Sequence, residues 1–265
     1  MYDTSSSTVR RLLVRGMLAG LIAGLFAFVV AYAVGEPSVD ASIAVEEAAA
    51  KAAHAGHGAA AAAEEAEEEL VSRDVQSTAG LATGVLVYGV ALGGIASLAF
   101  AFVLGRVGRF TPKATAALVA AAAFTTVYLV PFLKYPATPP AVGNPDTIGK
   151  RTTLFFLMIL LSVLLGVAAV IAGRRLAPRL GNWNATLVAG AGFVAAVAVA
   201  CALLPGNDDA VQVGFPAAVL WEFRLATLGI QAVLWAVFAV AFGVLAQRLL
   251  APAAPRTAVA EPVTV

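Results

Sequence analysis

Both histidines of the chain lie close to a run of glutamates in one polar stretch. KAAHAGHGAAAAAEEAEEEL, residues 51–70, places His54 and His57 three residues apart. On a helix this spacing puts both imidazoles on one side, and neutral imidazole binds cobalt, nickel, copper or zinc, with carboxylates completing the site. The carboxylates that follow are those of Glu64, Glu65, Glu67, Glu68 and Glu69, and the first four are the candidate ligands. The pattern predicts a metal-collecting site. The alternative is an unspecific solvated linker, because alanine-rich tracts often serve as linkers.

The rest of the chain is unusually apolar. Of its 265 residues, 60% are hydrophobic and 12% are charged, whereas soluble domains have about 45–50% and about 25%. The formal net charge of +1 gives no indication of nucleic-acid binding. A single cysteine, Cys201, excludes a disulfide framework. The sequence contains no phosphate-binding glycine loop, nucleophile elbow or zinc-protease motif, so we do not expect an enzyme.

The apolar residues are grouped into stretches that could cross a bilayer. A membrane helix needs roughly 20 mostly apolar residues. Six stretches reach this length: 12–34, 78–104, 114–133, 152–173, 185–204 and 225–247. The predicted fold class is an all-α integral membrane protein with six transmembrane helices, surrounded by lipid.

The basic residues predict the orientation of these helices. With the amino terminus in the cytoplasm, the inside segments hold eleven Lys and Arg residues and the outside loops hold six. By the positive-inside rule both termini are cytoplasmic, and we expect a location in a cytoplasmic (inner) membrane. The inside connections are short, so the helices pair as three hairpins that open outward. We expect a cytoplasmic amino terminus over 1–11, a membrane domain over 12–250 with an acidic extracytoplasmic loop at 35–77, and a disordered cytoplasmic tail over 251–265.

Few polar side chains lie within the predicted spans. The main ones are Ser162, Thr125, Thr126, Tyr128 and Gln231. Ser and Thr hydroxyls at depth are expected to bond backbone carbonyls or to stabilise helix contacts. The spans contain no chain of carboxylates and no nucleophile–base pair, which argues against a proton-relay pump and against catalysis within the membrane.

Small residues predict how the helices pack. Gly16, Gly20 and Gly24 recur every four residues along the first span. Gly80, Gly84, Gly89, Gly93 and Gly94 make the second span similarly smooth. Such ridges allow two helix backbones to approach closely, so we expect these faces to be packing surfaces.

Two further polar segments lie at the predicted outer mouth. KYPATPPAVGNPDTIGKRT, residues 134–152, is stiffened by four prolines and is expected to form an ordered cap or to fold over the mouth. LPGNDDAVQVGFPAAVLWEFRLATLG, residues 204–229, leads into the last span. The candidate residues of the mouth are Tyr135, Asn144, Asp146, Asp208, Asp209, Glu222 and Arg224. We expect Arg224 to pair with Asp146 or Asp208, which would tie the two segments together.

These segments also carry a family resemblance. RRLLVRGMLAGLIAGL, KYPATPPAVGNPDTIG and LLPGNDDAVQVGFPAAVLWEFRLATLGIQ together resemble the probable cobalt transporter subunit family CbtA, over residues 10–250. The resemblance implies an integral membrane protein of five or six helices, linked to cobalt uptake for cobalamin synthesis. It also implies a partner, CbtB, a small single-span subunit with a histidine-rich tail. Relatives often have more histidines in the first outer loop than the two found here.

The leading hypothesis is therefore a membrane component of a cobalt uptake system. Cobalt would be the transported substrate, and no cofactor would be bound permanently. An acidic outer loop would raise the local concentration of cations, and the two histidines would favour a transition metal. The rival hypothesis is a non-transporting auxiliary or scaffold membrane protein that binds a partner subunit, and it is favoured by the scarcity of polar groups at depth.

Overall fold

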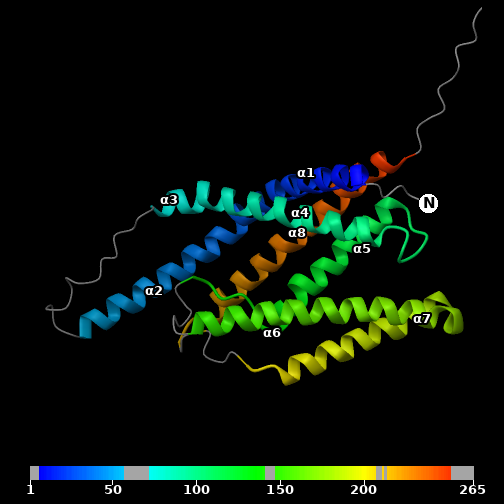
Figure 1. The fold of residues 1–265 in the computed structure, drawn as a ribbon. Helices are drawn as coiled ribbons and strands as arrows, with labels where there is room; N and C mark the ends of the chain where they lie inside the picture. Colours follow the sequence, from blue (N-terminus) through cyan, green and yellow to red (C-terminus); the bar gives the residue numbers. More distant parts are fainter. Residues whose placement is uncertain (1–5, 57–71, 141–146, 207–210, 212–213, 252–265) are drawn as a thin grey trace, which may run out of the picture.

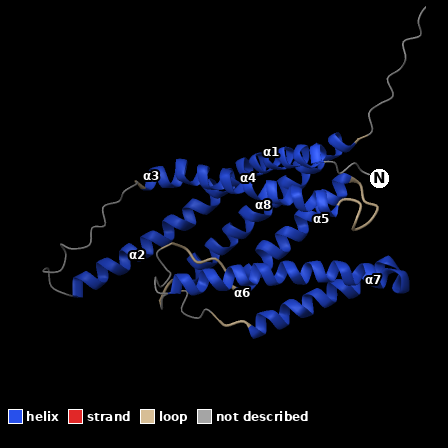
Figure 2. Ribbon diagram, in the orientation of Figure 1, coloured by secondary structure: helices blue, strands red, loops and turns tan. Residues whose placement is uncertain are grey.

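The computed structural model describes residues 6–56, 72–140, 147–206, 211 and 214–251, and these residues form helices without any strand (Figure 2). Five helical runs are long and apolar enough to cross a membrane, namely Ser6–Ala49, Arg73–Val103, Pro112–Lys134, Ile148–Leu203 and Ala217–Leu250. The elements in chain order are α1 (Ser6–Val30), η1 (Ala31–Gly35), α2 (Glu36–Gly56), α3 (Arg73–Val75), η2 (Gln76–Gly80), α4 (Leu81–Val103), α5 (Pro112–Ala123), η3 (Phe124–Leu129), α6 (Val130–Lys134), α7 (Ile148–Leu203) and α8 (Ala217–Leu250); those marked η are π-helical. The all-helical fold class is confirmed for the described residues, and the long apolar helices are consistent with a membrane protein. The six predicted spans correspond to five helical runs, because one run holds two of them.

The first helix does not end at Val34, where the sequence predicted the start of a loop. It continues through η1 into α2, so the described part of the predicted loop 35–77 is helical at both of its ends. Pro37 lacks the N–H that an α-helix requires and clashes with the preceding turn. The wider π-helical turn of η1 ends two residues before Pro37. Such a turn accommodates the missing N–H and the steric clash of the proline, so the helix continues. Pro131 likewise lies two residues after η3.

Gly16, Gly20, Gly89 and Gly93 form the closest helix contact in the described structure, as the sequence predicted, whereas a Cβ added to Gly84 would meet nothing within 4 Å. A Cβ atom added to Gly20 would lie 2.1 Å from the carbonyl oxygen of Gly89. A Cβ added to Gly93 would lie 2.4 Å from the carbonyl oxygen of Gly16. These distances are shorter than any real Cβ contact, so α1 and α4 pack backbone against backbone and only glycine fits there.

The last helix packs in the middle of the bundle. α8 lies against α1 and α5, as the orange ribbon of Figure 1 shows. Its buried aromatic residues, Trp235, Phe238 and Phe242, join Phe100 of α4 in the main hydrophobic core. Arg15 of α1 donates a hydrogen bond of 2.6 Å to the carbonyl oxygen of Leu245 near the end of α8. The neighbours of α8 are therefore mainly α1 and α5, whereas the predicted hairpins paired it with the span before it.

Two of the predicted spans, 152–173 and 185–204, lie in a single element, α7. Gly181 interrupts it with a φ of 74° and a ψ of 160°, and the chain reverses there into two limbs, 148–180 and 182–203, seen as yellow-green and yellow ribbons in Figure 1. Leu154 and Met158 of the first limb pack with Ala200 of the second and with Val130 of α6. The RRLAPRLGNW connection is thus reduced to one non-helical glycine.

One end of the bundle holds the described segments that carry the basic residues counted above as inside. The start of α1, the connection after α4, the reversal of α7 and the end of α8 lie toward the same side of Figure 1. We call this the basic end. The starts of α4, α7 and α8 lie at the opposite end, which we call the acidic end because α2 with its carboxylates projects from it.

Candidate functional site

The predicted metal-collecting residues lie at and beyond the end of α2. His54 is in α2, two residues before the helix ends at Gly56. His57, Glu64, Glu65, Glu67 and Glu68 lie outside the described residues. Among the residues that the structure describes, no group of three or more His, Cys, Asp or Glu side chains could hold a metal ion. The histidine site therefore stays a prediction.

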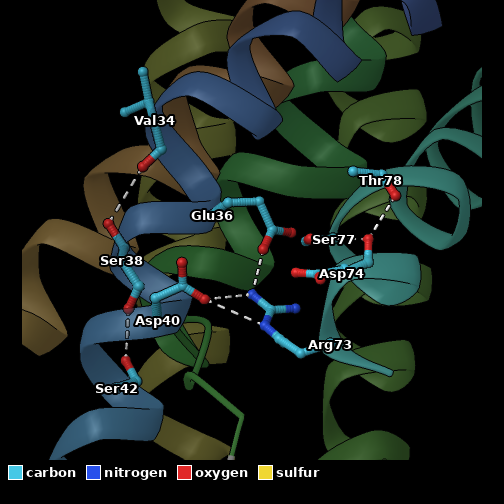
Figure 3. A network of polar contacts seen from close by, with 9 residues as sticks. All are labelled: Val34, Glu36, Ser38, Asp40, Ser42, Arg73, Asp74, Ser77 and Thr78. Atoms are coloured by element: carbon cyan, nitrogen blue, oxygen red, sulfur yellow. Dashed lines mark hydrogen bonds and ion pairs between the residues drawn. The ribbon is translucent and has the colours of Figure 1, made fainter. Parts of the chain in front are cut away.

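An arginine clamp joins α2 to the beginning of the next helical run (Figure 3). The Arg73 guanidinium forms an ion pair with Glu36 and donates two hydrogen bonds to Asp40 Oδ1, at 2.9 and 3.2 Å. Glu36 and Asp40 are four residues apart, so both carboxylates lie on one face of α2. The sequence placed both acids in a cation-collecting loop. In the structure Arg73 neutralises them, and their availability to a metal ion is reduced accordingly.

The surroundings of the clamp are held by hydroxyl groups that bond their own helices. Ser42 Oγ donates to the carbonyl oxygen of Ser38 at 2.8 Å, and Ser42 is fully buried. Thr78 Oγ1 donates to the carbonyl oxygen of Asp74 at 2.5 Å. Further along α2, Lys51 pairs with Glu47 at 3.6 Å on an exposed surface. Glu47 is thus the third described outer carboxylate with a basic partner, after Glu36 and Asp40, which Arg73 holds.

The proline-rich segment is attached to two helices at the acidic end. Tyr135 is buried, and its hydroxyl donates a hydrogen bond of 2.9 Å to the carbonyl oxygen of Pro205. Burial raises the pKa of Tyr135 above its ordinary value, so the hydroxyl remains a donor. Arg224 Nε donates to the carbonyl oxygen of Ala137 at 3.3 Å. These two contacts tie residues 135–137 to the segment that follows α7 and to α8. Residues 141–146 lie outside the described residues, so the predicted cap stays a prediction.

Most of the other residues predicted for the outer mouth lie outside the described residues. Glu222 lies exposed on α8, two residues before Arg224. Asn144, Asp146, Asp208 and Asp209 lie outside the described residues. The predicted pairing of Arg224 with Asp146 or Asp208 therefore stays a prediction, and the partner that the structure adds is a backbone carbonyl.

Hydroxyl groups predicted to satisfy backbone carbonyls do so. Thr125 and Thr126 each donate to the carbonyl oxygen four residues earlier, both at 2.8 Å. Ser162 is fully buried and donates to the carbonyl oxygens of Ile159 and of Thr126. Thr126 lies in η3, where the π-helical spacing disturbs the ordinary bonding of the helix. Ser162 therefore fastens α7 to this irregular turn.

A second group of polar side chains meets between α4, η3 and α8. Tyr88 of α4 lies beside Gln231 of α8, and Tyr128 of η3 lies beside Thr227 of α8. Tyr88 is 43% exposed and so lies at the edge of this group. Yet Tyr128 Oη and Gln231 Oε1 are buried and have no hydrogen-bond partner of normal geometry among the described residues. We call Tyr88, Tyr128, Thr227 and Gln231 the polar cluster. Sequence reasoning named Tyr128 and Gln231 but missed Tyr88 and Thr227, because nothing in the sequence indicates which helices are neighbours.

Comparison with known proteins gives one match. The family model described as "Probable cobalt transporter subunit (CbtA)" matches residues 9–247. No curated protein and no solved structure matches the chain. The matched range begins in α1 and ends in α8, so it includes the arginine clamp, the polar cluster and the glycine ridges.

Proposed function

The chain belongs to the probable cobalt transporter subunit family, CbtA, and from this premise we propose that it takes up cobalt across the bacterial cytoplasmic membrane to supply cobalamin synthesis. The observation that carries the proposal is the family match over nearly the whole helical body. The five long apolar helices fit a multi-pass membrane protein. A transporter subunit needs no catalytic centre, and the proposal includes none.

The distribution of charge supports uptake from the acidic end. In our proposal this end faces outward, and both termini are cytoplasmic because the basic end faces the cytoplasm. His54, His57, Glu64, Glu65, Glu67 and Glu68 collect the ion on the outer segment. Glu36 and Asp40 contribute less than their number suggests, since Arg73 offsets their charge.

The word subunit in the family description implies a partner. We propose a small histidine-rich single-span protein of the CbtB type. The second limb of α7 offers a surface for a membrane helix, because Val194, Val199 and Leu203 are among its exposed apolar residues. The same surface favours the alternative function, a scaffold that binds a partner and transports nothing.

Radioactive cobalt accumulation in cells tests the proposal. Cells expressing this chain together with the partner are expected to accumulate cobalt faster than cells expressing the partner alone. Changing His54 and His57 to alanine should raise the cobalt concentration needed for half-maximal uptake and leave the maximal rate nearly unchanged, because the outer segment supplies ions to a path built elsewhere. Imidazole binds metal only when neutral, so this effect should fade below about pH 6.5.

The matched control changes Lys51 and Glu47 to glutamine, which removes an exposed ion pair of the same helix without removing a metal ligand. Cobalt uptake that is equal with and without the chain contradicts transport and leaves the scaffold function. A partner that is retained with the chain on purification, without any uptake, is the result that the scaffold function predicts.

A further inference from the structure

Two buried polar atoms of the polar cluster have no hydrogen-bond partner among the described residues. Tyr128 Oη and Gln231 Oε1 are two of the few such atoms in the described residues, and Trp235 Nε1, one helical turn after Gln231, is another. An unsatisfied polar group in a hydrocarbon environment costs several kcal/mol. Phenylalanine and leucine would fill the same space without that cost. The cluster is therefore expected to receive a polar ligand.

We infer that the polar cluster holds a hydrated divalent cation at one step of its passage through the membrane. This inference rests on the proposed uptake function. Water molecules bound to a cation are strong donors, and Gln231 Oε1 and the tyrosine oxygens are acceptors that can receive them. A cation that keeps part of its hydration shell binds such acceptors through its waters, as Mg²⁺ commonly does.

The absence of charge within the cluster suits passage and not storage. Its four side chains are two tyrosines, a threonine and a glutamine, all neutral at physiological pH. Conduction requires that binding is favourable enough for entry and weak enough for release. A carboxylate at this depth would hold a divalent cation far more tightly. The neutral cluster therefore fits an ion in transit.

The position of the cluster indicates the side from which it is reached. Toward the basic end the core is filled by aromatic rings: Phe238 stacks on Phe242 with centroids 5.3 Å apart, and Phe242 meets Phe100 edge-on at 5.0 Å. All three rings are almost completely buried. Packed aromatic rings thus fill the core between the cluster and the basic end, and in our proposal the ion enters the cluster from the acidic end.

Transport by variants of the full chain tests this inference. Gln231→Leu and Tyr128→Phe are each expected to lower the maximal rate of cobalt uptake about tenfold, the effect of losing one buried hydrogen bond to a charged species. The matched controls are Gln247→Leu, near the end of the same helix, and Tyr32→Phe, an exposed tyrosine of η1. Both controls should keep the wild-type rate. Histidine variants change the half-saturating concentration, so a fall in the maximal rate distinguishes the cluster from the collecting site.

Binding by the purified chain separates this inference from the proposed function. Cobalt chloride is titrated calorimetrically into the full chain in lipid nanodiscs, and a symmetric gel-filtration peak checks that each variant is folded. Weaker binding by Gln231→Leu than by Gln247→Leu supports the cluster. The inference is overturned if the wild-type chain takes up cobalt and the Gln231→Leu and Tyr128→Phe variants take it up and bind it equally well. Wild-type cells without uptake contradict the proposed function, and the titration still decides whether the cluster binds the ion.

Discussion

The α1–α4 pair and the two limbs of α7 have similar apolar compositions but opposite kinds of packing. In α1 and α4, glycines bring two backbones into contact, and added Cβ atoms at Gly20 or Gly93 would collide with carbonyl oxygens. In the second limb of α7, Gly190 and Gly192 have nothing within 4 Å of an added Cβ. A glycine in an apolar helix therefore brings two helices close together only where another backbone lies against it. The loosely covered limb of α7 is surface for lipid or for another subunit.

The largest expected effect concerns the side of the membrane on which α7 reverses, and thiol labelling tests it. We expect the reversal at the basic end, on the cytoplasmic side. After Cys201→Ser, single cysteines at Arg109 and Asn182 are expected to be shielded from an impermeant reagent in intact cells. Cysteines at Ser72 and Glu222 should be labelled. All four positions are exposed on the protein, so shielding reports the membrane side and not burial. Outside labelling at Asn182 alone would mean that α7 does not reverse within the cytoplasm.

Substitution at the glycine interface is the next largest effect. Gly93→Leu should destabilise the purified protein by about 3 kcal/mol or more, because a side chain must fit where a Cβ already lies 2.4 Å from the carbonyl oxygen of Gly16. Unfolding by increasing fractions of denaturing detergent measures the change. Gly190→Ala and Gly84→Ala, which meet nothing within 4 Å, are the controls and should change stability by less than about 0.5 kcal/mol. Equal losses at Gly93 and Gly190 would remove the contrast between the two regions.

The reversal of α7 depends on one backbone conformation. Gly181 has a φ of 74° and a ψ of 160°, a region open essentially only to glycine. Gly181→Ala is expected to destabilise the protein by about 1–2 kcal/mol in the same detergent measurement. Gly192→Ala on the second limb serves as the control. A neutral Gly181→Ala would show that the limbs tolerate another reversal and are even less constrained than the structure indicates.

The arginine clamp gives the smallest effect. Arg73→Gln removes the partner of Glu36, whose side chain is only 14% exposed, and should cost about 1 kcal/mol, with less loss at high salt. Lys51→Gln removes the more exposed pair with Glu47 and should cost less than about 0.5 kcal/mol. The comparison uses the same unfolding assay at two salt concentrations. An Arg73→Gln loss that does not depend on salt would assign the contact to hydrogen bonding and not to charge.

The sequence alone determined the features that depend on local composition. The apolar stretches predicted where helices cross, because a bilayer core requires a minimum length of apolar residues. The spacing of Gly16, Gly20 and Gly24 predicted a packing face, and Ser162 was expected to bond a backbone carbonyl, as it does. The metal ligands around His54 and His57 remain predictions from residue type, since most of them lie outside the described residues.

Only the tertiary structure decided which distant residues meet. Whether α1 continues past Gly35 depends on a π-helical turn that accommodates Pro37, and a residue pattern does not show that turn. Arg73 could have paired with any of the outer acids, and the approach of α3 to α2 selected Glu36 and Asp40. Tyr88 and Gln231 lie beside each other because α8 packs centrally in the bundle. In a membrane all apolar helix faces are nearly equivalent to lipid, so close packing and a few hydrogen bonds determine the neighbours, and both depend on three-dimensional shape.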